Sequence, residues 1–94
     1  MLGSYNKVSV ASEDVIAAAK FAIAARSKAI QPRGDQPGEL RLLKILRADQ
    51  QVVAGTNYRL VLRVEENGSE KTVEAIVWWQ PWRKPNPYEL SSWK

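Results

Sequence analysis

Apolar and polar residues alternate along two neighbouring stretches in the second half of the chain. From Tyr58 to Glu65, and again from Thr72 to Trp79, an apolar side chain occupies every second position. A period of two is typical of a strand with one buried face. Asn67-Gly68, between the two stretches, is the strongest short signal for a hairpin turn. The pattern therefore predicts two antiparallel strands, and Tyr88 to Trp93 predicts a last short strand.

Residues 12–28 have the period of an amphipathic helix instead. Ser12 is a good N-cap, and Glu13 and Asp14 place negative charge where the helix dipole favours it. Most of the apolar arc is alanine, so the helix can approach its partner closely, and Phe21 at the edge of the arc fills the remaining gap. The loop Gln31–Gly38 ends the helix. The arc consists of Val15, Ile16, Ala18, Ala19, Ala22, Ile23 and Ala25.

Residues 39–53 fit two structures equally well. Their leucines and isoleucine match a helical stripe as well as a strand, and Leu, Lys and Arg all favour helix. The local pattern therefore leaves helix and strand open here. Residues 4–10 are free to add a leading edge strand to the sheet.

Composition excludes several classes of site. The 94 residues make one small domain, 1–94, with room for about one sheet covered by one helix. The chain has no cysteine and no histidine, which removes disulfides, thiol nucleophiles, and the commonest general base and metal ligand. Its carboxylates, such as Glu13-Asp14 and Glu65-Glu66, lie in solvent-like positions. We therefore expect no enzyme, no catalytic residue, no cofactor and no metal site.

The charge distribution favours a solvated surface. The formal net charge is +4, but Lys and Arg are spread along the chain and no cluster exceeds Arg83-Lys84. We therefore expect no nucleic-acid partner. No window is apolar for long enough to span a membrane, and Met-Leu-Gly-Ser-Tyr is not a signal peptide. The chain is expected to be cytoplasmic, or secreted with its signal peptide absent from this sequence.

Three short motifs mark candidate contact points. Gln51-Val52-Val53-Ala54-Gly55 has the form Gln-x-Val-x-Gly, Pro81-Trp82 begins twenty-six residues after its glycine, and Gly3 lies near the amino terminus. Valines are poor turn formers, so two of them at a turn indicate an exposed contact surface. The alternative is a purely structural turn in which the glycine supplies a positive φ.

The tryptophans divide into two groups. A tryptophan at a hairpin tip has little core to enter, so Trp82 is expected to be exposed on a binding surface. Trp78 and Trp79, which belong to the preceding strand, are expected in the core or at its flank.

Together with three further patterns, these motifs resemble the cystatins, and the plant cystatins most closely. Ala19-Lys20-Phe21-Ala22-Ile23 is similar to the plant helix signature, Glu74-Ala75-Ile76-Val77-Trp78 to the strand before the second loop, and Glu89–Lys94 to the chain end. The resemblance covers essentially the whole chain. It implies an α+β fold in which one helix packs on a four- to five-stranded twisted antiparallel sheet, and it makes residues 39–53 a strand. It also implies a reversible, tight-binding inhibitor of papain-like cysteine (thiol) proteases.

In cystatins the loop that corresponds to Gln51–Gly55 enters the protease cleft. By this resemblance Gln51 braces the loop with side-chain hydrogen bonds. Val53, next to Val52, supplies apolar contact. Ala54 and Gly55 let the backbone come close to the enzyme.

The resemblance also assigns roles at the other two motifs. Pro81 fixes the approach of the second loop, and Trp82 supplies an aromatic anchor. Gly3 lets the chain turn into the unprimed side of the cleft, where Leu2 occupies the pocket for the second residue before the scissile bond. The implied protease-binding set is Leu2, Gly3, Gln51, Val52, Val53, Ala54, Gly55, Pro81 and Trp82.

Two other functions remain open at this point. One is a binding module, natural or engineered, on the same scaffold with a target that is not a protease, although the intact loop motifs argue against it. The other is single-stranded nucleic acid binding by Arg59, Arg63, Lys71 and the tryptophans on an open sheet face, against which the scattered charge argues. We also expect a mainly monomeric chain that forms a domain-swapped dimer when the turn at Gln51–Gly55 opens.

Overall fold

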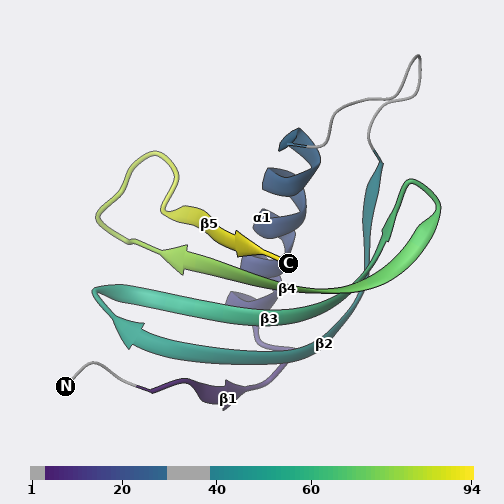
Figure 1. Cartoon of the computed structure of the whole chain (residues 1–94). Coiled ribbons are helices and arrows are strands. Elements are labelled where there is room, and N and C mark those ends of the chain that lie inside the picture. Colours follow the sequence, from purple (N-terminus) through teal and green to yellow (C-terminus); the bar gives the residue numbers. More distant parts are fainter. Residues whose placement is uncertain (1–3, 30–38) are drawn as a thin grey trace.

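The computed structural model describes residues 4–29 and 39–94. Within them, one helix crosses one face of an antiparallel sheet in which the strands follow one another in chain order, β1 to β5 (Figure 1). The elements are β1 (Asn6–Val8), α1 (Glu13–Ala29), β2 (Leu40–Val53), β3 (Gly55–Glu66), β4 (Ser69–Trp79) and β5 (Tyr88–Trp93). This is the α+β architecture that the sequence predicted.

The elements begin and end close to their predicted bounds. α1 starts directly after Ser12, which confirms the helix over 12–28, and β5 spans the predicted last strand. Residues 40–53 form a strand, so the choice that local pattern left open is decided by pairing along the length of β3. The leading strand is confirmed but short, since β1 pairs with β2 over three residues. The predicted loop Gln31–Gly38 lies outside the described residues.

The core lies between α1 and the sheet. The buried residues of α1 are mostly alanine, so its backbone lies close to the strands, as the sequence predicted. Phe21 covers the edge of this contact and stacks on Tyr88 of β5, with ring centres 5.4 Å apart. The buried core consists of Val15, Ala18, Ala19, Ala22, Ala48, Tyr58, Leu60, Leu62, Val64, Val73, Ala75 and Val77.

The turn between β3 and β4 forms as predicted. Asn67 has a φ of 50° and Gly68 a φ of 88°. Two consecutive positive φ values match the right-handed twist of the flanking strands, which is why Asn-Gly is favoured at such turns. This turn lies at the end of the sheet that is far from the β2–β3 turn (Figure 1).

Two tyrosines near the start of α1 are held in their neutral form. Tyr58 and Tyr88 line a cavity of about 90 Å³ together with Asp14 and Trp79. Burial raises the pKa of both phenols above the usual value, and the negative charge of Asp14 raises it further. The fold therefore favours the protonated phenols over the phenolates.

Alkaline pH should consequently destabilise the protein. Because the folded-state pKa of each phenol is above its unfolded value of about 10, the stabilisation is complete below pH 10 and is lost as pH rises through the folded pKa. Urea unfolding from pH 7 to pH 11.5 checks this, with a decline in the free energy of unfolding expected above about pH 10. The double variant Tyr58→Phe/Tyr88→Phe should decline less steeply, and an equally steep decline would disprove the assignment.

Candidate functional site

Three segments that are far apart in the sequence meet at one end of the sheet. The β2–β3 turn, the connection between β4 and β5, and the chain that leads into β1 all lie at the left end in Figure 1. Strand register fixes this arrangement, because Thr56, directly after the first turn, pairs with Trp79 at the end of β4, and Trp79 pairs with Tyr88 at the start of β5. The sheet thus brings the first two motifs, Gln51–Gly55 and Pro81–Trp82, to one end.

The first loop, Gln51–Gly55, is the tip of a nearly continuous hairpin. β2 runs to Val53 and β3 begins at Gly55, so Ala54 is the one connecting residue. The expected strand over 39–53 is confirmed, but a turn over all of Gln51–Gly55 was wrong, because the strands pair as far as Val53 and Gly55. A tip built in this way is held by ladder hydrogen bonds on both sides.

The side chains of this tip differ in exposure. Val52 is 61% exposed and Ala54 is also exposed, whereas Val53 is half-buried. Gln51 accepts a hydrogen bond at 3.2 Å on Oε1 from Nδ2 of Asn57, across the hairpin. This contact is the kind of bracing that was expected of Gln51.

Gly55 has no room for a side chain. Its φ is +80°, a region that other residues rarely adopt, and a Cβ at this position would lie 2.1 Å from the backbone oxygen of Trp79. The absent side chain therefore serves the packing of β3 against the end of β4, as well as the turn itself. Any substitution here displaces the tip.

The second loop, Pro81–Trp82, lies within the connection from Gln80 to Pro87. Backbone hydrogen bonds hold this connection: the Gln80 amide donates to the Pro87 carbonyl at 2.6 Å, and the Arg83 amide donates to the Gln80 carbonyl at 2.9 Å. Pro81 is exposed, and Trp82 is 56% exposed, so a large apolar side chain stands in solvent on a fixed turn. Exposed aromatic residues on rigid tips are typical of protein-binding surfaces.

The third motif cannot be placed in the same way. Leu2 and Gly3 lie outside the described residues, and the description of the chain begins at Ser4. Tyr5, the next residue, lies beside the first loop, because Tyr5, Val53, Ala54, Asn57, Ile76, Trp78 and Ser91 line a shallow groove of about 520 Å³. The chain therefore enters the fold next to the first loop.

The sequence profile of the SQAPI family, described as aspartic acid proteinase inhibitor, matches residues 7–94. Cysteine proteinase inhibitor A of Helianthus annuus is 36% identical over 76 residues, which cover 81% of this chain and 83% of that protein. This chain belongs to the plant cystatin-like family of proteinase inhibitors. The resemblance drawn from the sequence is thereby confirmed, and the family is one of inhibitors rather than enzymes.

Other plant cystatin relatives are longer than this chain. Cysteine proteinase inhibitor 3 of Arabidopsis thaliana is 39% identical over 71 residues, which cover 76% of this chain and 52% of that protein. Cysteine proteinase inhibitor 3 of Oryza sativa subsp. japonica is 35% identical over 82 residues, which cover 87% of this chain and 40% of that protein. The chain thus spans about half or less of the length of these curated relatives.

Solved cystatins confirm the fold. The crystal structure of dimeric human cystatin F superimposes with a TM-score of 0.80 at 16% identity, covering 100% of this chain and 86% of that one. The salivary cystatin of the soft tick Ornithodoros moubata superimposes with a TM-score of 0.74 at 18% identity, covering 100% of this chain and 97% of that one. At these sequence identities the similarity shows a shared fold and nothing about function.

Trp78 links the two loops of this cystatin. Its indole Nε1 donates a hydrogen bond of 2.8 Å to the carbonyl of Ala54, and its ring meets that of Trp82 edge to face, with centres 6.1 Å apart. The prediction of a core or flank position is confirmed for Trp79, which packs against the core, but it was incomplete for Trp78. The alternation of side chains along β4 distinguishes the two tryptophans, because Trp78 points to the face opposite buried Val77.

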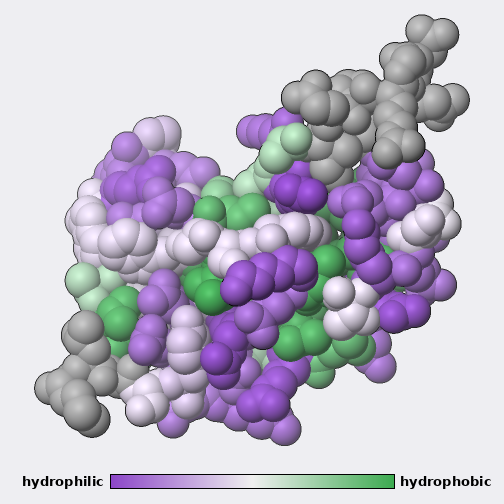
Figure 2. Space-filling view, viewed as in Figure 1, coloured by the Kyte–Doolittle hydropathy of each residue, from purple (hydrophilic) through white to green (hydrophobic). Residues whose placement is uncertain are grey.

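The described residues at this end of the sheet offer apolar side chains and backbone. In residues 4–29 and 39–94, no group of three or more acidic, histidine or cysteine residues is arranged to hold a metal ion. The helix of this part of the chain is not long and apolar enough to cross a membrane. Figure 2, seen from the same side as Figure 1, shows hydrophilic side chains interspersed with small apolar patches over the strands. Apolar tips, a braced backbone and an exposed tryptophan are what this end of the cystatin offers.

Proposed function

We propose that this cystatin is a reversible, tight-binding inhibitor of papain-like cysteine proteases. The amino terminus, the first loop and the second loop together would fill the active-site cleft of the enzyme. One observation carries the proposal: exposed Val52 and exposed Trp82 stand on tips that Trp78 joins through its contacts with Ala54 and Trp82. The relatives named cysteine proteinase inhibitors supply the class of target.

The mechanism is steric occlusion. The tips present apolar side chains and backbone to the enzyme, and no peptide bond is offered in line to the catalytic thiolate. Occlusion in this way leaves the inhibitor intact. Because strand pairing, the Gln51–Asn57 hydrogen bond and the Trp78 contacts hold the tips before binding, little conformational entropy is lost on docking.

A second target class has one observation in its favour. The family profile that matches residues 7–94 is described as aspartic acid proteinase inhibitor. Cysteine proteases remain the preferred target, because the chain retains Gln-x-Val-x-Gly and Pro-Trp at exposed tips and its relatives carry the corresponding name. Pepsin, assayed beside papain, separates the two classes.

Hydrogen exchange of the inhibitor with and without excess papain tests the proposed binding surface. Backbone amides of Val52 to Ala54 and of Trp82 and Arg83 should exchange at least tenfold more slowly in the complex, because the enzyme excludes water from both tips. The Asn67-Gly68 turn at the far end of the sheet serves as the internal control and should be unaffected. Protection that is confined to α1 or to strand residues away from the two tips would place the interface elsewhere and refute the proposal.

We further propose that heating produces an inactive, domain-swapped dimer. If the tip opens, β2 and β3 can run on as one strand, so that α1 and β1 pack onto a second molecule with almost all contacts retained. Opening requires only that Ala54 and Gly55 become extended, which removes the positive φ of Gly55. One structural neighbour, human cystatin F, was crystallised as a dimer.

Size separation after heating near the unfolding midpoint tests this expectation. The dimer should be stable at room temperature and should inhibit papain at least a hundredfold less well per subunit than the monomer, since the first loop no longer exists in it. A dimer that inhibits as well as the monomer would mean that the exchange uses a different hinge.

A further inference from the structure

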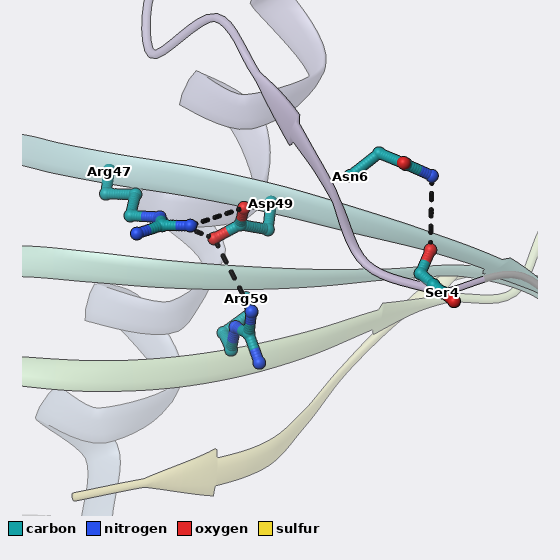
Figure 3. A network of polar contacts seen from close by, with 5 residues as sticks. All are labelled: Ser4, Asn6, Arg47, Asp49 and Arg59. Atoms are coloured by element: carbon teal, nitrogen blue, oxygen red, sulfur yellow. Dashed lines mark hydrogen bonds and ion pairs between the residues drawn. The ribbon is translucent and has the colours of Figure 1, made fainter.

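A buried carboxylate lies on β2, at a position where the sequence pattern did not predict one. Asp49 of β2 is 4% exposed. Two hydrogen bonds from Arg47 reach it, from Nε to Oδ2 at 3.0 Å and from Nη2 to Oδ1 at 3.3 Å, and Nη2 of Arg59 lies 3.7 Å from Oδ2 (Figure 3). A buried carboxylate without partners would destabilise the fold strongly, so these two guanidinium groups are what makes its burial tolerable.

Arg59 continues the contact beyond Asp49 to the start of the chain. Its guanidinium carbon lies 4.2 Å from the centre of the Tyr5 ring, which is well within the range of a cation–π interaction. Arg59 belongs to β3, and β3 is separated from β1 by β2, so its side chain reaches across one strand to contact Tyr5. We call Tyr5, Arg47, Asp49 and Arg59 the Asp49 cluster.

The segment that this cluster holds is otherwise fixed by the short β1–β2 pairing and by Val8, which packs against the core. β1 pairs over three residues, two of which are exposed, and the described residues before it, Ser4 and Tyr5, belong to no strand. A hydrogen bond near the start of the chain is local: the side-chain Nδ2 of Asn6 donates to the Ser4 carbonyl at 3.2 Å (Figure 3). A three-residue edge strand is among the least stable parts of a fold, so an added contact at Tyr5 should slow its opening measurably.

The position of Tyr5 connects the cluster to the binding end of the protein. Tyr5 lines the same groove as Val53, Ala54 and Trp78, so fixing Tyr5 fixes where the chain lies relative to the first loop. Arg59 itself lies on β3 between Tyr58 and Leu60 of the core, and Asp49 follows buried Ala48. Arg59 and Asp49 are therefore attached to strands β3 and β2, whose neighbouring residues are buried in the core.

We infer that the Asp49 cluster positions the amino-terminal segment for target binding, with Tyr5, Arg59 and Asp49 acting as positioning residues that do not themselves touch the enzyme. This inference rests on the proposed function, in which residues before Ser4 contact the protease. Asp49 orients Arg59, Arg59 holds the Tyr5 ring, and the ring keeps Tyr5 beside Val53 and Ala54 of the first loop. Without the cluster, Tyr5 and the start of β1 would have to be fixed in place at the moment of binding, which would shorten the lifetime of the complex.

Two substitutions at Tyr5 separate this role from simple packing. Tyr5→Leu removes the ring face but keeps an apolar side chain, whereas Tyr5→Phe keeps the ring and is the matched control. Each variant is made in the 94-residue chain and in a chain that lacks residues 1–3. Arg59→Gln, which removes the cation and keeps the ring, is the second route to the same loss.

The first measurement needs no protease. Hydrogen exchange at the amides of Asn6 to Val8 should accelerate about tenfold in Tyr5→Leu and in Arg59→Gln, and should stay within about twofold in Tyr5→Phe. Exchange in β3 should remain unchanged in the two Tyr5 variants. Unchanged exchange in β1 in both Tyr5→Leu and Arg59→Gln would overturn the inference, because it would show that the cluster does not stabilise β1.

The second measurement is the rate of dissociation from papain. Tyr5→Leu should raise this rate about tenfold in the full chain and less than about twofold in the shortened chain, since the cluster acts through the residues that have been removed. An equal effect in both chains would mean that Tyr5 contacts the enzyme directly, and no effect in either would mean that positioning is irrelevant. Both outcomes overturn the inference. A full chain that does not bind papain would refute the proposed function, and the exchange of β1 would still decide whether the cluster holds this segment.

Discussion

Replacing Gly55 by alanine is expected to weaken inhibition of papain at least a hundredfold, or by about 2.7 kcal/mol. Two causes act together. A φ of +80° costs an alanine about 1–2 kcal/mol, and the new Cβ would lie 2.1 Å from the Trp79 carbonyl oxygen, so the hairpin tip must move away from β4. That movement also breaks the hydrogen bond between Trp78 and Ala54, which aligns the first loop with the second. The inhibition constant of the variant measures the effect, and tryptophan at this position should be worse still.

Gly68 provides a matched control for this substitution. Its φ of +88° is nearly the same, but nothing lies within 4 Å of a Cβ at that position. Gly68→Ala should therefore lower the stability of the fold by about 1–2 kcal/mol and leave inhibition of papain unchanged. Equal losses of inhibition in the two variants would show that general destabilisation, rather than displacement of the tip, explains the effect at Gly55.

Trp82→Ala should cost about 2 kcal/mol or more of binding free energy, which is about a thirtyfold increase in the inhibition constant. The side chain is 56% exposed in the free protein, so it has much surface to bury against an enzyme and little role in the core. For the same reason the melting temperature should change by less than about 2 °C. Inhibition assays and thermal unfolding of the same preparation give both values.

Leu46→Ala is the control for exposed apolar surface in general. Leu46 is 45% exposed, like Trp82, but it lies on β2 away from the β2–β3 turn, so Leu46→Ala should leave inhibition unchanged.

If Trp82→Ala loses as much folding stability as binding free energy, the tryptophan belongs to the fold through its contact with Trp78 rather than to the interface.

The fold could be predicted from the sequence wherever the pattern was local. Alternation from Tyr58 to Trp79 and the Asn67-Gly68 turn were sufficient for the central hairpin. β2 could not be predicted in the same way, because its leucines, lysine and arginines favour a helix and its strand structure comes from pairing with β3. Here the resemblance to a family supplied what local propensity could not.

The candidate site was predictable in its motifs but not in its connections. The exposure of Trp82 followed from its place at a hairpin tip, and it is confirmed. Val53 was singled out for apolar contact, yet Val52 is the more exposed of the two valines, because the strand continues through the motif and sets which side each faces. The Trp78 link and the burial of Asp49 depend on cross-strand neighbours, and these are known only once the register is known.

Inhibition of papain by the purified chain tests the central claim most directly. A fluorogenic peptide assay with increasing inhibitor should give competitive, sub-micromolar inhibition, with the inhibitor recovered intact after long incubation and with trypsin unaffected. Pepsin, assayed in parallel, should retain its activity. Papain activity that is unchanged at tens of micromolar inhibitor would contradict the account, and inhibition of pepsin instead would assign these tips to the aspartic class of target.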